Sequence, residues 1–576
     1  MRNKILTYSL FAIGIMAICM FAILPLFHAG YFVMHDDEQI ARLQQMYLVL
    51  SQGQIPPRWI PDLGFGYGYP LFNFYPPLVY YVGSFFHTIG FSFITSTKLV
   101  MGLGFFLSAG AMFLWVRKHY GIIAGFFAAL LYTYAPYHSV DLYVRGALSE
   151  FFSWIWVPLI FWSLDLLFEK PEKKYMVLFG IFFAFLMLSH SLVMLQFGSF
   201  FLLYTGVLFW RKIVFWRRYI VFLLGGILLG LGLSAYFWIP SLAEKQFTLV
   251  DSILITQLAN YAIHFVCPVQ LWSSPWGYGG SVAGCVDGLS FQIGKIQAIV
   301  GAGGILLSIF YITKKRQKIV LLVSVLFLCS IFLTLPFSQV FWNIAKPFWY
   351  IQFPWRYLLF VAVFSAFLGG ALVACIKQKF GRKIAIITCL ILSFLAIYQV
   401  RNYFQPLSYR YVLDKQLTSL VDIQWRVSRM SYEYVPKEVA TRLSLNKTTE
   451  LAIDYSQIPL EKSFTALTDN MQVKELENLS QLKKYSVNVY NTKTLSEGIL
   501  QINTYNFPGW EVWVDGQKST HFIKNKLDLI DIALPEGQHT VVVELMNTPV
   551  RAVANIVTGV SLIALLGAIL WRKKHI

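Results

Sequence analysis

Three acidic residues stand together near the start of the chain, in the stretch HDDE at residues 35–38. Asp36, Asp37 and Glu38 come shortly after an apolar run that ends at Phe27. A carboxylate held at such a place could accept the proton of a hydroxyl group, and general-base catalysis of this kind contributes about 10²–10⁴ in rate. A second interpretation stays open, because acids at the start of a helix also cap its free N–H groups without any chemistry.

Three arginines could bind an anion near these acids. Arg58 lies in IPPRWIPD, Arg145 in DLYVRGALSE and Arg356 in IQFPWRYL. Each falls on the outer side in the membrane topology that the basic residues predict. An interfacial arginine can simply contact lipid headgroups, but guanidinium is also the side chain best shaped to bind phosphate. We therefore expect an anion site that these three arginines share.

Other polar and aromatic residues could complete the site. Glu150 heads an expected span, where it could cap the helix or neutralise a nearby arginine. His190, in MLSHSL, is equally consistent with a hydrogen-bonded packing residue. The full set of candidate substrate-binding residues beside the two aspartates is His35, Glu38, Arg58, Tyr69, Tyr75, Asp141, Arg145, Glu150, His190 and Arg356.

Metal and cysteine patterns are sparse. No H-x-E, HExxH or CxxC spacing occurs, so a dedicated zinc site is not expected. A divalent ion that bridges Asp36 or Asp37 to a phosphate stays open, because hard oxygen ligands suit such an ion. Cys267 and Cys285 share one expected outer segment, where oxidising conditions permit a disulfide. We predict that they are bonded; two unpaired thiols are the alternative.

The composition is that of an integral membrane protein. Hydrophobic residues make up 57% of the chain and charged residues 13%, whereas soluble domains have about 45–50% and about 25%. The net charge of +18 comes from short Lys/Arg clusters between apolar runs, which is the bias of cytoplasmic loops. No basic face or aromatic-basic RNA motif is present, so nucleic-acid binding is not expected.

Apolar runs predict about twelve membrane spans, with both termini in the cytoplasm. Three segments between them are too long to be turns and are expected outside: 28–96, 241–294 and 401–550. Apolar residues at Ile40, Leu43, Met46 and Leu50 favour a helix from Asp36 along the membrane surface, with the acids in its first turn. The spans are expected near 5–27, 97–116, 121–138, 151–168, 175–190, 192–210, 219–240, 295–312, 319–335, 357–376, 384–400 and 552–570.

The segment after residue 400 changes character. Stretches such as YSVNVYN, EVWVDG and HTVVVEL alternate apolar and polar residues, which is typical of strands in a β-sandwich. We therefore divide the chain into a polytopic membrane domain at 1–400, an extracytoplasmic β-rich domain at 401–550, and a final span with a basic tail at 551–576. The expected fold class is an α-helical membrane protein with an outer β-sandwich.

Three stretches carry a resemblance to a known family. HDDEQIARLQQMYLVLSQGQIPPRWIPDLGFGYGYPLFNFYPPLVYY, YAPYHSVDLYVRGALSE and IQFPWRYL together resemble bacterial membrane proteins of the 6-pyruvoyl-tetrahydropterin synthase-related family, which look like members of the GT-C glycosyltransferase superfamily. The tail YNFPGWEVWVDGQ…LPEGQHTVVVEL is similar to the outer β domain of YfhO-type membrane proteins.

The resemblance implies a glycosyltransferase in the bacterial cell membrane. It implies a polyprenyl-phosphate-sugar donor and a cell-envelope glycan, lipid or protein as acceptor. Asp36 and Asp37 fall at the position of the superfamily's acidic motif, and one of them would be the general base. Because the acidic motif here is a run of three, which acid is the base stays open.

Two alternatives to a transferase remain. One is a lipid or glycan transporter or flippase, although few charges lie inside the spans and no matching pair of broken spans is evident. The other is a non-catalytic protein that binds envelope components. Replacing Asp36 and Asp37 separates the classes, because only the transferase should lose its activity while it still folds.

Overall fold

The computed structural model describes residues 2–571 except 211, 213–215, 255–259, 312–313, 443–454, 492–496 and 522–524. Within these residues, eight helices are long and apolar enough to cross a membrane, and two shorter apolar helices accompany them. The long ones are α1 (Arg2–Ile23), α5 (Phe93–Tyr120), α8 (Leu148–Glu169), α10 (Ser191–Trp210), α11 (Trp216–Leu233), α16 (Lys314–Thr334), α18 (Leu358–Gln399) and α22 (Pro549–Trp571).

A helix occupies each expected span. The remaining ones are α6 (Ile122–Thr133), α9 (Lys173–Ser189) and α15 (Lys295–Tyr311). The two spans expected at 357–376 and 384–400 both fall in α18, which is broken at Gly381, where φ is 88°. Since only eight helices meet the length and hydropathy of a span within the described residues, the number of twelve crossings stays a prediction.

The segment between α1 and α5 is compact. It contains the 3₁₀ turn η1 (Leu24–Phe27), the short strand β1 (Tyr31–Phe32), and the helices α2 (Gln39–Ser51), α3 (Leu71–Phe74) and α4 (Leu78–Thr88). Most of α2 is buried, so this segment packs into the molecule and is not a loose loop. Strand β1 pairs with β2 (Tyr409–Arg410) in antiparallel register. That pairing ties the start of the chain to the segment after α18.

The other connections are built from short helices. Between α6 and α8 lie α7 (Pro136–Ser139) and the π-helix η2 (Val140–Val144). Further along the chain are α12 (Ala235–Glu244), α14 (Pro268–Trp272) and α17 (Gln339–Ile344). After β2 come α19 (Asp414–Leu417), the π-helix η10 (Asp422–Val427), α20 (Ser428–Met430) and α21 (Lys437–Arg442).

Two sheets form the β-rich region. One has the order β4-β5-β10-β7-β8 and the other β3-β6-β9, and each pairing is antiparallel. The Asp515–Gly516 turn between β7 and β8 has positive φ at both residues, as a tight hairpin requires. The strands are β3 (Phe464–Ala466), β4 (Met471–Asn478), β5 (Leu482–Val489), β6 (Glu497–Tyr505), β7 (Trp510–Val514), β8 (Gln517–Ser519), β9 (Leu529–Pro535) and β10 (Gly537–Leu545).

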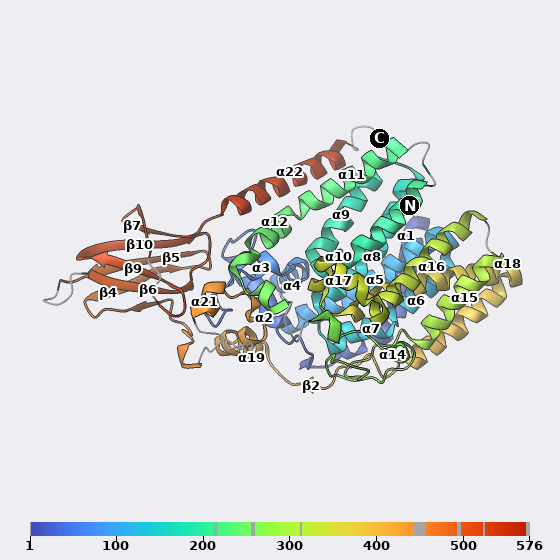
Figure 1. The fold of residues 1–576 in the computed structure, drawn as a ribbon, viewed down its shortest axis with the longest axis horizontal. Helices are drawn as coiled ribbons and strands as arrows, with labels where there is room; N and C mark the ends of the chain where they lie inside the picture. Colours follow the sequence, from blue (N-terminus) through green and yellow to red (C-terminus); the bar gives the residue numbers. More distant parts are fainter. Residues whose placement is uncertain are drawn as a thin grey trace.

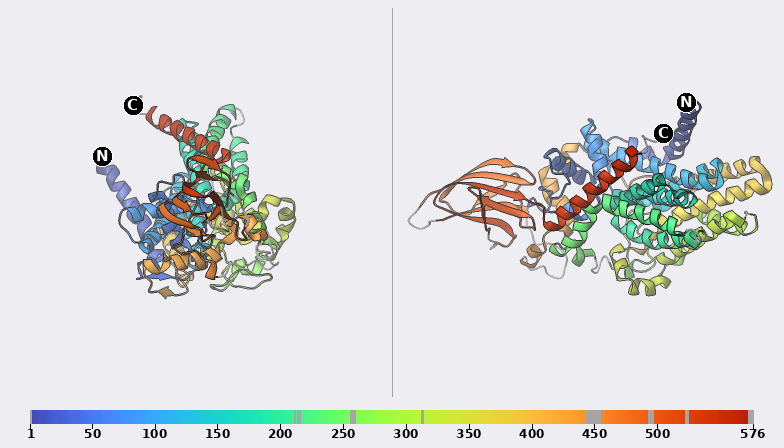
Figure 2. Two further views of the ribbon diagram at one scale, coloured as in Figure 1. Left: turned by 90° about the vertical axis from the view of Figure 1, so that its left-hand side faces the viewer. Right: turned by 90° about the horizontal axis from the view of Figure 1, so that it is seen from above.

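The strands lie at one end of the molecule, beyond α2, α3, α4, α19 and α21 (Figure 1). Helix α22 runs back from them along α11 and α12, and both ends of the chain lie on the side away from the strands (Figures 1 and 2). The predicted fold class, an α-helical membrane protein with a β-sandwich, is confirmed. The proposed division at residues 400 and 550 stays a prediction, although the strands begin only at Phe464.

Candidate functional site

The acidic stretch docks onto the connection that follows η2. The backbone N–H of Asp36 donates to the carbonyl of Arg145 at 2.8 Å. Gly146 permits this approach: its φ is 70°, and a Cβ there would lie 2.0 Å from Sδ of Met34. A side chain at residue 146 would therefore push the two segments apart. The backbone thus fixes Asp36 beside an arginine that the sequence had placed in the same site.

Two of the three acids already have arginine partners. The Asp37 carboxylate accepts hydrogen bonds from Arg410 at 3.0 Å and from Arg426 at 3.3 Å. Glu38 forms an ion pair of 3.1 Å with Arg42, one helical turn further on. These pairs neutralise both carboxylates and hold the start of α2 against the segment after β2.

Asp36 differs from both of its neighbours. Its side chain is half-buried, and no described residue lies within ion-pair or hydrogen-bond distance of its carboxylate. It interacts electrostatically with Arg145 and Arg356. Of the three acids, Asp36 is therefore the one whose oxygens remain available to a bound molecule.

Burial changes the acidity of the two paired acids. Burial raises the pKa of Glu38 to about 7, although the positive charge of Arg42 acts in the opposite direction. Burial likewise raises the pKa of Asp37 above its ordinary value, against the lowering effect of Arg426 and Arg410. In both cases the loss of hydration outweighs the neighbouring guanidinium groups.

A buried charge cluster lies next to Asp36. Oε2 of Glu150, at the start of α8, accepts hydrogen bonds from Nη1 of Arg145 at 2.8 Å and from Nε of Arg356 at 3.1 Å. Its Oε1 accepts from the Tyr137 hydroxyl at 2.6 Å. Asp141 also binds Nη1 of Arg145, at 2.6 Å. One glutamate thereby holds two arginines from distant parts of the chain in a single place.

Both arginines keep N–H groups that the described residues do not use. Arg145 makes its hydrogen bonds through Nη1, and Arg356 through Nε and Nη1, so Nη2 of each forms none within the described part of the chain. A planar guanidinium group can present these hydrogens to the oxygens of a phosphate. The arrangement can accept a proton at Asp36 and bind an anion at Arg145 and Arg356.

Arg58 does not lie in this charge cluster. The prediction that three arginines share one anion site is therefore corrected to two. Nη1 of Arg58 donates to Asn73 at 2.8 Å and to the carbonyl of Tyr236 at 2.7 Å. Its Nη2 donates to Asn555 of α22 at 2.9 Å. These partners belong to a different buried cluster, so Arg58 joins the first extramembrane segment to the last helix.

Two aromatic residues were also expected to face a substrate. Tyr69 is fully buried, and its hydroxyl lies 3.0 Å from that of Ser431. Tyr75 stacks under the Arg42 guanidinium, 4.2 Å from the ring centre. These contacts show Tyr69 packing inside the protein and Tyr75 supporting the arginine that holds Glu38.

The two histidines have local partners. Nε2 of His35 lies 2.7 Å from the carbonyl of Tyr278. Nδ1 of His190 accepts the N–H of Val193 at 3.1 Å, so His190 caps the start of α10. His190 also interacts electrostatically with Glu150. It stands at the edge of the charge cluster without a hydrogen bond to it.

The helix expected from Asp36 begins only at Gln39, so the three acids precede it and do not lie in its first turn. Helix α2 starts at Gln39, with Glu38 as its N-cap residue, and the Glu38 side chain makes no capping hydrogen bond. None of its first-turn residues is acidic. The structure therefore gives no support to helix capping as the role of Asp36.

The structure contains the predicted disulfide. Cys267 and Cys285 are joined in a disulfide, with their Cα atoms 5.6 Å apart. Among the described residues, no group of three His, Cys, Asp or Glu side chains could hold a metal ion. A divalent ion that bridges Asp36 or Asp37 to a phosphate stays a prediction, because one or two carboxylates plus a substrate phosphate can bind such an ion.

An apolar groove runs between α1 and α5, and residues 28–30, which precede β1, line part of it. Its volume is about 1040 Å³, and most of its lining is apolar. Residues 412–415 close one end, together with Lys98, whose Nζ donates to the His28 carbonyl at 2.6 Å. Lys98 forms no ion pair with a described residue. The β1–β2 pair connects this end of the groove to Asp37 through Arg410.

Sequence reasoning missed several residues of this region. Arg42 could have been found, since it follows Glu38 at the i,i+4 spacing of a helical ion pair. Arg410 and Arg426 carry no local signal, because they lie 373 and 389 residues from Asp37 in the sequence. Tyr137 was likewise overlooked, although it holds Glu150.

The fold and the site define a polytopic membrane protein with a charged site between the α1–α5 segment and the starts of α8 and α18. Residues 72–407, more than half of the chain, match the family described as "6-pyruvoyl-tetrahydropterin synthase related domain; membrane protein". The chain belongs to this family. The matched region contains Arg145, Glu150 and Arg356, and it begins after the acidic stretch.

Individual similarities are more distant. An uncharacterized protein of Lactococcus lactis subsp. cremoris (strain MG1363) is 27% identical over 244 residues, which are 41% of this chain and 40% of that protein. The structure is similar to the Archaeoglobus fulgidus oligosaccharyltransferase tethered with an acceptor peptide, at 12% identity and a TM-score of 0.42, over 71% of this chain and 55% of that chain.

A further similarity is to ArnT from Cupriavidus metallidurans, at 13% identity and a TM-score of 0.39, over 79% of this chain and 84% of that one. The chain thus spans less than two thirds of the Lactococcus protein and of the oligosaccharyltransferase. These likenesses are too distant to assign an activity.

Proposed function

We propose that this protein is a membrane glycosyltransferase of GT-C type. It transfers a sugar from a polyprenyl-phosphate-linked donor to a cell-envelope acceptor at the outer face of the membrane. Asp36 is the general base, and Arg145 and Arg356 hold the donor phosphate. One observation carries the proposal: Asp36 has no partner among the described residues, while Asp37 and Glu38 are each bound to arginine.

The reaction needs one base and one anion site. Asp36 takes the proton of the acceptor hydroxyl as its oxygen forms a bond to the anomeric carbon of the sugar. The bond from that carbon to the phosphate oxygen breaks at the same centre, and its electron pair stays on the lipid phosphate. Because phosphate leaves as a stable anion, no general acid is required. The charges of Arg145 and Arg356 lie where the negative charge develops, which favours the transition state.

The groove between α1 and α5 suits the isoprenoid chain of the donor. It is mostly apolar, and Lys98, which forms no ion pair with a described residue, lines it together with residues 412–415. A chain bound there stays in the hydrocarbon layer, and its phosphate is held close to the β1–β2 pair. This placement explains why the acids follow so closely after the first span, because the reacting carbon lies at the same depth.

Exchanging the two aspartates one at a time tests the assignment. With purified protein in nanodiscs and a polyprenyl-phosphate sugar, Asp36→Asn should lower kcat about a hundredfold or more with little change in donor binding. Asp37→Asn is the matched control: it weakens the contacts with Arg410 and Arg426 but removes no reacting group, so its kcat should stay within a few fold. Equal activity of Asp36→Asn and the wild type would refute the base assignment.

A second candidate function, lipid transport, has one observation in its favour. Asp165 is buried in α8, where it lies 2.7 Å from Nε2 of His119 and accepts hydrogen bonds from Tyr204 and Trp115. Ionisable residues inside a membrane often mark a transport pathway. Asp165→Asn should then abolish transfer of a labelled lipid across vesicles that contain the protein, whereas a transferase should keep its turnover.

A further inference from the structure

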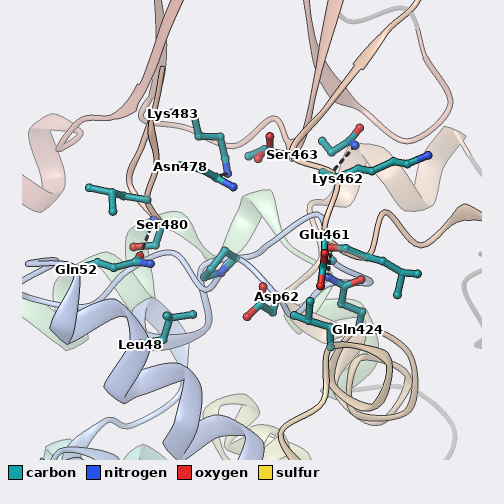
Figure 3. A pocket seen from close by; sticks show the side chains of 17 residues that line it. Leu48, Gln52, Asp62, Gln424, Glu461, Lys462, Ser463, Asn478, Ser480 and Lys483 are labelled. Atoms are coloured by element: carbon teal, nitrogen blue, oxygen red, sulfur yellow. Dashed lines mark hydrogen bonds between the residues drawn. The ribbon is translucent and has the colours of Figure 1, made fainter. Parts of the chain in front are cut away.

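A polar cavity lies between the first extramembrane segment and the β-rich region. Its volume is about 290 Å³. The C-terminal end of α2 and residues 61–66 form one wall, and strands β4, β5 and β6 with their connections form the other (Figure 3). Polar side chains dominate the lining, among them Gln52, Asp62, Gln424, Ser463, Asn478 and Lys483.

A buried lysine and a half-buried aspartate face this cavity, and neither forms an ion pair with a described residue. Lys483 is 5% exposed, and its Nζ donates to Oδ1 of Asn478 at 2.7 Å. Asp62 stands on the opposite wall and accepts a hydrogen bond from Gln45 at Oδ2, at 2.7 Å (Figure 3). No carboxylate among the described residues lies within ion-pair distance of Lys483, and Oδ1 of Asp62 accepts no hydrogen bond from them. Both groups keep hydrogen-bonding capacity for a third partner.

The Gln424 side chain supplies a further unused acceptor. It is 1% exposed, its Nε2 donates to the Leu460 carbonyl at 2.9 Å, and its Oε1 has no hydrogen-bond partner among the described residues. Gly66 makes room for it, since a Cβ at residue 66 would lie 2.6 Å from Cδ of Gln424. A buried carbonyl oxygen that accepts no hydrogen bond is costly, so a donor group from a bound molecule would stabilise this wall.

This inventory defines the chemistry of the ligand. The ligand must donate to Gln424 and to Asp62 and must accept from Lys483, and hydroxyl groups do both. The formal charges of the lining, two acids and two lysines, cancel, so neither a phosphate nor a cation is favoured. The volume is at the lower end for small-molecule sites, which are about 300–1,000 Å³.

We propose that this cavity binds one neutral sugar residue, held by Gln424, Asp62 and Lys483. Helix α2 has its N-terminus beside Asp36 and its C-terminus at the cavity, and its 13 residues place the two sites about 20 Å apart. The proposal that the cavity binds a sugar does not depend on the proposed transfer reaction. An acceptor role for the bound sugar, as a distal unit of the glycan, rests on the proposed function.

Binding is tested on the full-length protein in nanodiscs with glucose, galactose and N-acetylglucosamine, each alone. Saturation-transfer NMR should detect at least one of them, and Lys483→Met and Gln424→Met should weaken that binding at least about tenfold. Lys518→Met is the matched control, since Lys518 lies in β8 and does not line the cavity. Unchanged binding in both cavity variants would overturn the proposal, as would binding of none of the three sugars.

A second measurement on the wild-type protein does not depend on variants that fold. The bound sugar should slow the acylation of Lys483 by an amine-reactive reagent, and mass spectrometry measures the rate of acylation. Lys518 should react at the same rate with and without the sugar. Inorganic phosphate is the opposing probe: protection of Lys483 by phosphate and by no sugar would make this an anion site and contradict the proposal. Asp36→Asn should keep the sugar protection, so a failure of the transfer reaction is told apart from a failure of this site.

Discussion

At the scale of single residues, three adjacent carboxylates have three different environments. Asp37 binds Arg410 of β2 and Arg426 of η10, and Glu38 binds Arg42 one helical turn further on. The Asp36 carboxylate has no such partner among the described residues. The partners of each acid therefore decide its role, and the spacing of the acids in the sequence could not distinguish them.

The pH dependence of stability follows from Glu38. Burial raises its pKa from an ordinary value of 4.5 to about 7, with Asp36 and Glu433 acting in the same direction and Arg42 in the opposite one. Between these two values the folded protein binds more protons at this residue than the unfolded chain does. The free energy of unfolding should therefore fall as the pH rises from about 4.5 to 7.

The Glu38→Gln variant isolates this contribution, because glutamine does not titrate. Thermal unfolding in detergent, measured across that pH range, should give a smaller decline for the variant than for the wild type. Glu497→Gln, at an exposed residue of β6, is a control that should follow the wild-type curve. Parallel curves for wild type and Glu38→Gln would show that Glu38 titrates at an ordinary pKa in the folded protein.

At the scale of elements, the groove between α1 and α5 offers a test of donor binding. Gly102 of α5 lines the groove, and the nearest atom to a Cβ there would be Cδ1 of Leu26, at 3.8 Å. Gly102→Leu should fill the space that we assign to the isoprenoid chain. Overfilling a packed apolar space costs about 1–3 kcal/mol, so donor binding should weaken about tenfold.

Two variants serve as controls for this prediction. Gly102→Ala adds one methyl group at ordinary contact distance and should bind the donor normally. Gly198→Leu adds the same bulk in α10, where nothing lies within 4 Å of a Cβ. Donor affinity is measured by titration with a polyprenyl-phosphate sugar in nanodiscs. If Gly102→Leu binds like the wild type, the chain of the donor lies elsewhere.

The elements also show what sequence patterns can and cannot predict. Long apolar runs mark helices because each must cover about 30 Å of hydrocarbon, and a helix occupies each expected span. Periodicity found α2, but it could not fix the boundary at Gln39, since the apolar face starts only at Ile40. Local patterns carry no information on tertiary contacts, which is why Arg58 was grouped wrongly and Arg410 was overlooked.

In the whole molecule, the Arg58 cluster fixes the position of the β-rich region relative to the acidic stretch. The Arg58 cluster joins the first extramembrane segment to α22, since Arg58 binds Asn555 and lies beside a Glu244–Arg551 ion pair of 2.9 Å. The last helix therefore anchors the β-rich region against the segment that carries Asp36. This connection keeps the sugar cavity and the acidic stretch at a fixed separation.

The arrangement in the membrane is the last prediction. Strands β7 and β8 lie at one end of the molecule, and the ends of the chain lie on the side away from them (Figure 1). The break in α18 at Gly381 is flanked by Lys377, Lys379, Arg382 and Lys383, and such basic clusters favour the cytoplasm. A reporter inserted at the exposed Gly516 turn should therefore report the outside, and one inserted at Gly381 should report the cytoplasm.

Expression and thermal stability of each fusion protein show whether the insertion is tolerated. If both reporters lie on the same side of the membrane, the predicted topology is wrong. Asp36 would then not lie at the outer face, because the hydrogen bond from Ser480 to Gln52 holds the strands against the end of α2, the helix that follows the acidic stretch.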